Sequence, residues 1–163
     1  MASISAYGTG SAARTRGSAA LPTIRLLGLA AAGLATIGAA PSGRIDVEVA
    51  GLRSAKGNLL ICVTRDATHF PDCERDPASR RLTLAATTNA AHFPGLPSGD
   101  YAVSVVHDEN GNGRLDMTLR VPREGVGFSR NPRLLFGPPR FANVRVAVGS
   151  QPVEQKVQLK YFL

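Results

Sequence analysis

The sequence is poor in the side chains on which most enzymes and metal centres depend. Its 163 residues include two cysteines, three histidines and no tryptophan. The histidines, His69, His92 and His107, never occur in a His-x-x-x-His spacing, which would place two imidazoles on one helix face for zinc. The sequence also contains no Gly-x-Ser-x-Gly elbow and no Ser-x-x-Lys motif. We therefore expect a protein that is not an enzyme.

Acidic residues are missing from the first 45 positions. Arg14, Arg16 and Arg25 precede an apolar run over 26–40, and Pro41-Ser42-Gly43 ends that run. The run is shorter than the roughly 20 residues that a membrane-spanning helix needs. A basic start, a short apolar stretch and a helix-breaking end are typical of a secretory signal peptide.

This pattern predicts a signal peptide over 1–40, cleaved after Ala39 or Ala40, and a single domain over 41–163. The alternative is a retained membrane anchor. We expect a periplasmic or secreted protein with no transmembrane segment in its mature chain. Without the three leader arginines, sixteen basic and twelve acidic residues leave a net charge of +4. Because no basic helix or aromatic-interleaved basic stripe accompanies this charge, we do not expect a nucleic-acid partner.

Both cysteines, Cys62 and Cys73, belong to the predicted mature domain. In an oxidising compartment, an even pair favours a disulfide. Two buried thiols are the main alternative, since a metal pair would need further cysteine or histidine ligands.

Hydrophobic residues of the mature domain alternate with a period of two. Alternation of this kind, interrupted by glycine- and proline-rich turns, predicts strands rather than helices. The alternating positions are Ile45, Val47 and Val49; Leu59, Ile61 and Val63; Leu82 and Leu84; Tyr101, Val103 and Val105; Val144, Val146 and Val148; and Val157, Leu159 and Tyr161. We predict an all-β fold, an antiparallel β-sandwich of about seven strands of the Ig-like or transthyretin-like kind.

Leu96-Pro97-Ser98-Gly99-Asp100-Tyr101 opens one of these strands. The spacing is that of a tyrosine corner, in which the hydroxyl bonds back to the upstream backbone. The alternative is an ordinary core tyrosine. Both interpretations give Gly99 and Tyr101 structural roles.

Asp108 to Asp116 read Asp-Glu-Asn-Gly-Asn-Gly-Arg-Leu-Asp. In calcium loops, side-chain oxygens occupy positions one, three, five and nine, a carbonyl occupies seven, and glycine occupies six. Those positions are taken by Asp108, Asn110, Asn112, Asp116, the Arg114 carbonyl and Gly113. Position twelve falls on Leu119 instead of glutamate, so any Ca²⁺ site here would be weak, with a Kd of roughly 0.1 to 1 mM. The alternative is a hairpin loop whose Asp and Asn side chains bond their own backbone.

A second polar block follows. Gly125 and Gly127 permit unusual backbone conformations, and Gly127 and Phe128 are candidate structural residues of a loop over the end of the fold. Glu124 is the nearest acid downstream of Asp116. It either supplies the carboxylate missing at Leu119 or lies on the surface.

Together these blocks resemble a bacterial secreted family known as domain of unknown function 2141. The first block is Phe93 to His107 with the loop that follows, and the second comprises Pro122, Glu124, Gly125, Gly127, Phe128, Ser129, Asn131 and 137–141. The resemblance covers about Arg44 to Leu163. It implies a secreted β-sandwich and no established activity.

Two classes of function are compatible with these residues. The first is a non-catalytic envelope module that binds a protein, peptide or glycan through loops on a rigid scaffold. The second is a metal-dependent enzyme that uses His107, Asp108, Asp116 and Glu124. We expect the first, with a weak Ca²⁺ site as its only candidate cofactor.

Overall fold

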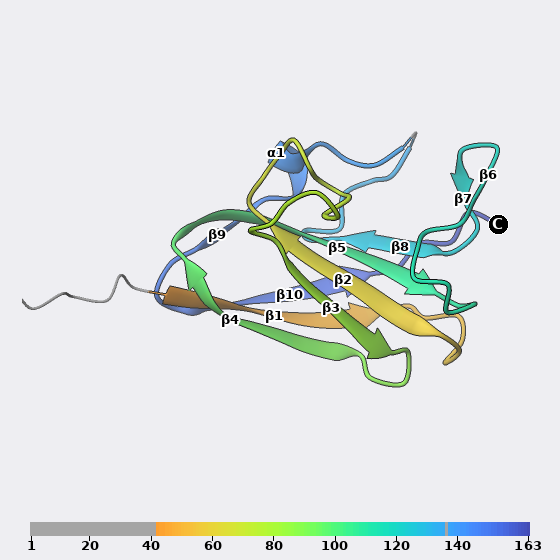
Figure 1. Ribbon diagram of the computed structural model, residues 1–163, viewed down its shortest axis with the longest axis horizontal. Helices are drawn as coiled ribbons and strands as arrows, with labels where there is room; N and C mark the ends of the chain where they lie inside the picture. Colours follow the sequence, from red (N-terminus) through yellow and green to blue (C-terminus); the bar gives the residue numbers. More distant parts are fainter. Residues whose placement is uncertain (1–41, 136) are drawn as a thin grey trace, which may run out of the picture. The chain divides into compact units, whose positions relative to one another are not determined.

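The structure is a computed structural model that describes residues 42–135 and 137–163. The predicted signal peptide therefore lies outside the described residues. The chain forms mostly β structure with one short helix (Figure 1). Its elements are β1 (Ser42–Ala50), β2 (Asn58–Thr64), β3 (Arg80–Ala85), β4 (Ala90–Pro97), β5 (Gly99–Asp108), β6 (Met117–Thr118), β7 (Val121–Pro122), β8 (Gly125–Phe128), α1 (Phe141–Val144), β9 (Val146–Val148) and β10 (Pro152–Gln158). Within the described ranges, no helix is long and apolar enough to cross a membrane.

The strands form two main open sheets and one small hairpin. The first sheet has the order β10-β1-β4 and the second has the order β3-β2-β5-β8, with β9 pairing with the start of β5. Strands β6 and β7 pair only with each other. Strand β1 runs parallel to β10, so the prediction of a purely antiparallel fold was wrong. Alternating side chains specify which face of a strand is buried but not the direction of its neighbour.

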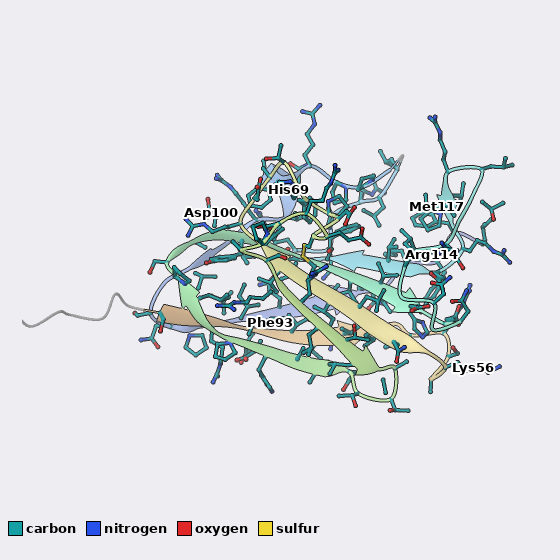
Figure 2. All side chains as sticks on the ribbon, in the orientation of Figure 1. Lys56, His69, Phe93, Asp100, Arg114 and Met117 are labelled. Carbon is teal, nitrogen blue, oxygen red and sulfur yellow. A yellow bond between two sulfur atoms is a disulfide. The ribbon has the colours of Figure 1, made fainter. Side chains whose placement is uncertain are left out.

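Side chains from both main sheets build the principal hydrophobic core. Val47 of β1 and Phe93 of β4 join Ile61 of β2 and Val103 of β5 in this core, and all four are buried. Figure 2 shows Phe93 between the strands of the two sheets. In β1 the buried side chains alternate with more exposed ones along the whole strand, and the first half of β4 follows the same pattern.

A smaller core lies on the opposite face of the β3-β2-β5-β8 sheet. It contains Val126 and Phe128 of β8 together with Ala102 and Val144, and the rings of Phe70 and Phe141 pack around it. This second core is why β2 and β5 read as nearly continuous buried runs over much of their length.

Strand β8 differs from the loop that we expected at Gly125 to Phe128. The two glycines are not in left-handed conformations, so conformational freedom is not why they stand there. A Cβ atom at Gly127 would lie 2.6 Å from Val157 Cγ1, and one at Gly125 would lie 2.5 Å from the Tyr161 ring. Glycine therefore allows the segment around β10 to pass close to β8, an approach that local sequence does not reveal.

Candidate functional site

The loop after β5 is organised around Asp108. The Asp108 side chain is fully buried and accepts hydrogen bonds from the backbone N–H groups of Gly111 (2.8 Å), Asn112 (3.1 Å) and Gly113 (2.7 Å). Gly113 has a φ of +79°, in the left-handed region that glycine adopts most easily. Asp108 thus closes a tight turn by bonding its own backbone, as aspartate does readily.

Three further side chains of the loop converge on one point. The Nδ2 atoms of Asn110 and Asn112 both donate to Asp116 Oδ2, at 2.7 and 3.0 Å. These two hydrogen bonds hold the pKa of Asp116 below its ordinary value. The amide oxygens of Asn110 and Asn112 accept the backbone N–H groups of Asn112 and Arg114 instead.

The residues predicted to bind calcium therefore lie in one loop. A cation at Asp116 Oδ2 would have to displace the two amide N–H groups that now donate to this oxygen. For Asn110 and Asn112 to act as ligands, each amide must turn its oxygen toward Asp116. Position twelve is Leu119, which has no carboxylate to offer a cation, and its side chain is almost wholly exposed. Among the described residues, no group of three or more His, Cys, Asp or Glu side chains is placed to hold a metal ion. A cation here would bind the Asp116 carboxylate, and its other ligands would be amide and carbonyl oxygens.

Glu124 fastens the base of this loop. Its carboxylate accepts the backbone N–H groups of Glu109 (3.2 Å) and Asp116 (3.0 Å), one on each oxygen. Only 4% of Glu124 is exposed, so the interpretation of Glu124 as a surface residue was wrong. Glu124 does approach the loop, but its carboxylate binds two backbone N–H groups there.

His107 is also buried, with a partner on each ring nitrogen. Its Nε2 lies 2.9 Å from the Lys56 carbonyl oxygen, and its Nδ1 lies 2.7 Å from the Tyr161 hydroxyl. Because a carbonyl can only accept, the proton belongs on Nε2, and Tyr161 donates to Nδ1. The same hydroxyl accepts the backbone N–H of Arg53 at 3.2 Å. Burial raises the pKa of the Tyr161 hydroxyl.

The guanidinium of Arg53 connects the segments around this histidine. It pairs with the Glu109 carboxylate, donates to the backbone oxygens of Arg123 (3.0 Å) and Leu163 (2.7 Å), and lies 4.5 Å from the centre of the Tyr161 ring. The hydrogen bond from Arg53 lowers the pKa of Glu109, against the opposing effect of burial. Sequence reasoning missed Arg53 and Tyr161, because their partners lie more than fifty positions away and no local motif marks them.

The four side chains named for the enzyme alternative thus have separate roles. His107 bonds to the 51–57 loop and Tyr161, whereas Asp108 closes the turn. Asp116 takes the two asparagine amides, and Glu124 holds the base of the loop. They do not share one open coordination shell.

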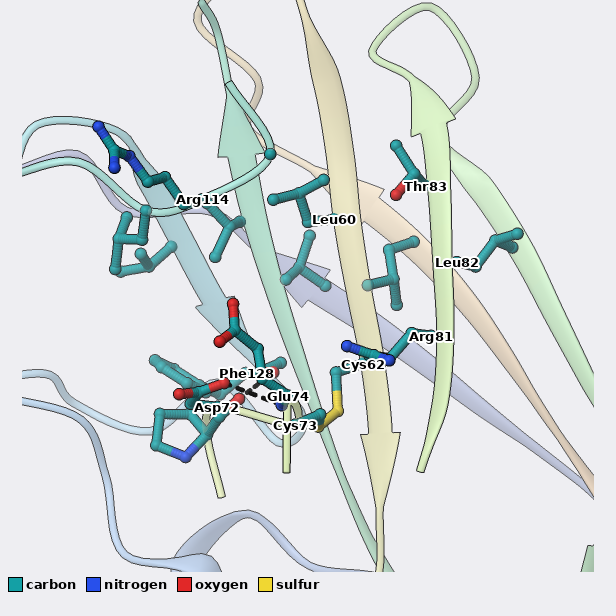
Figure 3. A pocket seen from close by; sticks show the side chains of 18 residues that line it. Leu60, Cys62, Asp72, Cys73, Glu74, Arg81, Leu82, Thr83, Arg114 and Phe128 are labelled. Atoms are coloured by element: carbon teal, nitrogen blue, oxygen red, sulfur yellow. Dashed lines mark hydrogen bonds between the residues drawn. A yellow bond between two sulfur atoms is a disulfide. The ribbon is translucent and has the colours of Figure 1, made fainter. Parts of the chain in front are cut away.

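A groove of about 790 Å³ lies on the second sheet beside this loop (Figure 3). Its floor is apolar and includes Leu60 of β2, Val106 of β5 and Val126 of β8. Gly113 to Leu115 form one wall and 71–74 another, with the β3 side chains along the remaining edge. The exposed charged residues at its rim are Asp72, Glu74, Arg81 and Arg114. The volume is within the range of ordinary ligand pockets.

The predicted disulfide forms one border of the groove. Cys62 of β2 is bridged to Cys73, as the pair of cysteines indicated. The intervening segment is further fastened by a hydrogen bond from Ser104 Oγ to the Pro71 carbonyl (3.0 Å). The wall over 71–74 is therefore attached to the sheet at two points.

At the other end of β5, the Tyr101 hydroxyl donates to the Pro97 carbonyl at 2.9 Å. This is the backward bond that defines a tyrosine corner. Gly99 beside it has a φ of +154°, and a Cβ there would lie 3.3 Å from the Arg65 guanidinium. Gly99 and Tyr101 thus shape the entry to the strand.

Comparison with known proteins identifies the family of this chain. A family model described as "Uncharacterized protein conserved in bacteria (DUF2141)" matches residues 47–156. No curated protein and no solved structure matches the chain.

Proposed function

Because this chain belongs to the DUF2141 family of uncharacterized bacterial proteins, whose description names no activity, we propose a function from the site itself. The domain is a non-catalytic module of the cell envelope that binds a peptide segment of a partner in the groove on its second sheet. The observation that carries this proposal is that the loop over 113–115 and the disulfide-linked segment over 71–74 wall the same apolar floor. The Ig-like or transthyretin-like sandwich arrangement of the two main sheets is part of the proposal, supported by the core that they share.

The floor favours a peptide over a glycan. Leu60, Val106 and Val126 offer aliphatic surface, and the only aromatic side chain among the lining residues, Phe128, is buried. An apolar floor with acidic and basic side chains at its rim suits a chain segment with one or two aliphatic residues and polar flanks.

The buried ionisable groups support a binding role over catalysis. The polar side-chain atoms of Asp108, Glu124 and His107 form hydrogen bonds with the backbone or with Tyr161, and these bonds fix loops in place. A catalytic acid or base must instead reach a proton of the substrate. We therefore favour a rigid display of loops over the metal-dependent enzyme.

A photo-crosslinking amino acid tests the groove directly. Placed at Thr83, an exposed residue of the groove, it should form adducts with a specific envelope partner in a native bacterial host. Thr87, exposed on the turn after β3, is the matched control position and should give none. Adducts that a protease removes identify a peptide or protein partner. Equal labelling at both positions, or none at either, would contradict the groove.

We also propose that the 108–116 loop binds Ca²⁺ weakly, which would stiffen one wall of the groove. The proximity of three side chains supports this, because turning the amides of Asn110 and Asn112 would bring their oxygens beside the Asp116 carboxylate. Calcium bound only to the folded state raises its stability by RT ln(1 + [L]/Kd), about 1.4 kcal/mol at tenfold excess over Kd. Magnesium should do much less, since it demands tight octahedral geometry and keeps its waters.

Asn112→Asp is the sharpest variant for this question. Without calcium, the new carboxylate faces Asp116 and should lower the melting temperature, because the hydrogen bond from Asn112 Nδ2 is lost. With several millimolar calcium, the additional ligand charge should enlarge the stabilisation beyond that of the wild type. Asp108→Ala is a poorer test, since it leaves three backbone N–H groups without their acceptor in any buffer.

Glu109→Gln is the control, because Glu109 points toward Arg53 and Ser54 and not toward Asp116. It should retain the wild-type response to calcium. If the wild type melts at the same temperature in chelator and in calcium, the self-bonded hairpin loop is correct. The groove proposal would survive that outcome, as it depends only on the crosslinking experiment.

A further inference from the structure

The β6–β7 hairpin stands apart from both main sheets. Figure 1 shows it projecting beside the end of the chain, and its two strands pair only with each other. Its base is fixed, since the Arg123 N–H donates to the Asp116 carbonyl at 3.0 Å and Glu124 holds the Asp116 N–H. The hairpin is therefore a small projection on a firm support.

Large apolar side chains surround its tip. Met117 is 51% exposed, Leu119 is 94% exposed and Val121 is 36% exposed. These three account for half of the exposed large hydrophobic residues that the described chain contains, the others being Leu135, Phe162 and Leu163. Leu163 also lies close to the hairpin, because Arg53 bonds its carbonyl and that of Arg123.

The apolar residues do not share one face. Met117 lies opposite Pro122 in the register, and Thr118 lies opposite Val121, so Met117 and Val121 occupy opposite faces of the ribbon. Leu119 lies at the turn between them. A partner that covers one face would leave the other apolar side in water, whereas a fluid apolar phase would enclose the whole tip.

The turn itself is formed by unfavourable residues. Leu119 and Arg120 have φ values of 49° and 68°, two consecutive left-handed residues in a two-residue hairpin loop. Such a loop strongly prefers Asn-Gly, and a bulky residue at positive φ is an outlier. Because the Leu119 side chain is almost wholly exposed, no packing within the protein offsets this strain. Strain of this kind is a sign of function.

Positive charge accompanies the apolar tip. The charged residues over 114–124 are three arginines, Asp116 and Glu124, and Glu124 is buried. Arg114, Arg120 and Arg123 are exposed on or beside the hairpin. The nearest acid, Asp116, is engaged by Asn110, Asn112 and Arg114. Arginines around an apolar tip match an anionic surface over an apolar interior.

We propose that the β6–β7 hairpin inserts its tip into the interface of an anionic lipid bilayer. Leu119 and its neighbours enter the boundary between headgroups and acyl chains, and the arginines bind the lipid phosphates. Interfacial binding of this kind grows with buried apolar area and with attraction to anionic lipids. The proposal requires neither calcium nor an occupied groove, and adds a membrane contact to the envelope role proposed above.

Vesicle sedimentation of the mature domain, in chelator, tests this proposal. The wild type should co-sediment with vesicles of equimolar phosphatidylcholine and phosphatidylglycerol, and much less with phosphatidylcholine alone. Salt should weaken the binding, because it screens surface charge. Failure of the wild type to bind the anionic vesicles would overturn the proposal and leave a protein as the occupant of the hairpin.

Leu119→Asn separates a membrane role from a structural one. Asparagine tolerates the left-handed conformation, so the melting temperature should stay the same or rise. The partition coefficient should nevertheless drop about tenfold, which corresponds to 1.4 kcal/mol. Arg120→Gln should reduce the preference for anionic vesicles.

Leu135→Asn is the matched control, since Leu135 is 77% exposed in a different loop. It should bind vesicles as the wild type does. Wild-type binding by Leu119→Asn, or an equal loss in Leu135→Asn, would overturn the assignment of the contact to the hairpin.

Discussion

At the scale of single residues, this domain uses its buried polar groups to hold loops. His107 fixes the 51–57 loop through the Lys56 carbonyl, Asp108 closes the turn after β5, and Glu124 joins two amides of the same loop. Ser129 joins β5 to α1 in a similar way, since its hydroxyl accepts the Val103 N–H and donates to the Val144 carbonyl. In the described part of the chain, every buried side-chain nitrogen and oxygen has a hydrogen-bond partner. Groups satisfied in this way rigidify a fold.

Glu109 provides a test of this arrangement by pH. The hydrogen bond from Arg53 holds its pKa below the ordinary value of a glutamate, so the folded state favours the charged form. That contribution is complete above the unfolded-state pKa of about 4.3, and it is lost as the pH falls through the lower folded-state pKa. Glu109→Gln should therefore melt below the wild type at neutral pH, and the difference should shrink in acid. Thermal melts of both proteins from about pH 7 to about pH 3 measure this difference.

Asp46, Asp66 and Asp116 also have pKa values below the ordinary value of an aspartate. They are present in both proteins, so the difference between the two melting temperatures isolates Glu109. A difference that stays constant with pH would show that the Arg53–Glu109 pair contributes through packing and not through charge.

At the scale of elements, β8 depends on the close approach of the end of β10. Gly127→Ala would place a Cβ 2.6 Å from Val157 Cγ1 and 3.1 Å from the Gln158 carbonyl oxygen. Overpacking of this kind typically costs about 1 to 3 kcal/mol. Chemical denaturation should show a loss of that size. Gly149→Ala is the control, because nothing lies within 4 Å of its added Cβ, and it should be nearly neutral.

The disulfide is the other element-level constraint. Cys62 lies in a strand of the sheet, and Cys73 lies in a segment without regular secondary structure. Cys73→Ser should lower the free energy of unfolding by about 2 to 4 kcal/mol, because the unfolded chain regains the freedom of an open loop. Urea denaturation measures this loss. A reducing agent should destabilise the wild type by a similar amount and leave the variant unchanged.

At the scale of the whole molecule, we propose that this disulfide-containing domain matures outside the reducing cytoplasm, since disulfides persist in oxidising compartments. The acid-free, arginine-bearing leader predicts the same, and the exported protein should begin close to Pro41. Amino-terminal sequencing of protein from the periplasm or the medium measures this. A mature chain that still begins at Met1 in a membrane fraction would favour the retained anchor.

The arrangement of strands shows how far the pattern of residues determined the molecule. Alternation located β1, β2, β3 and β5, because each has a face that must be buried and a side-chain period of two. It missed β4, whose Phe93-Pro94-Gly95 reads as a turn, and it placed Val144 in a strand although Val144 ends α1. It also placed the last strand too late in the chain, since β10 covers Pro152–Gln158.

The sequence by itself determined the β-rich class, the family, the cysteine pair and the loop of Asp108 to Asp116, because each of these is written in local spacing. Only the tertiary structure decided that β10 runs parallel to β1, that Glu124 anchors the loop and that Tyr161 links Arg53 to His107. These features depend on contacts between residues far apart in the chain. A local pattern specifies which side of an element is buried, whereas the partner that buries it is chosen by the packing of the whole domain.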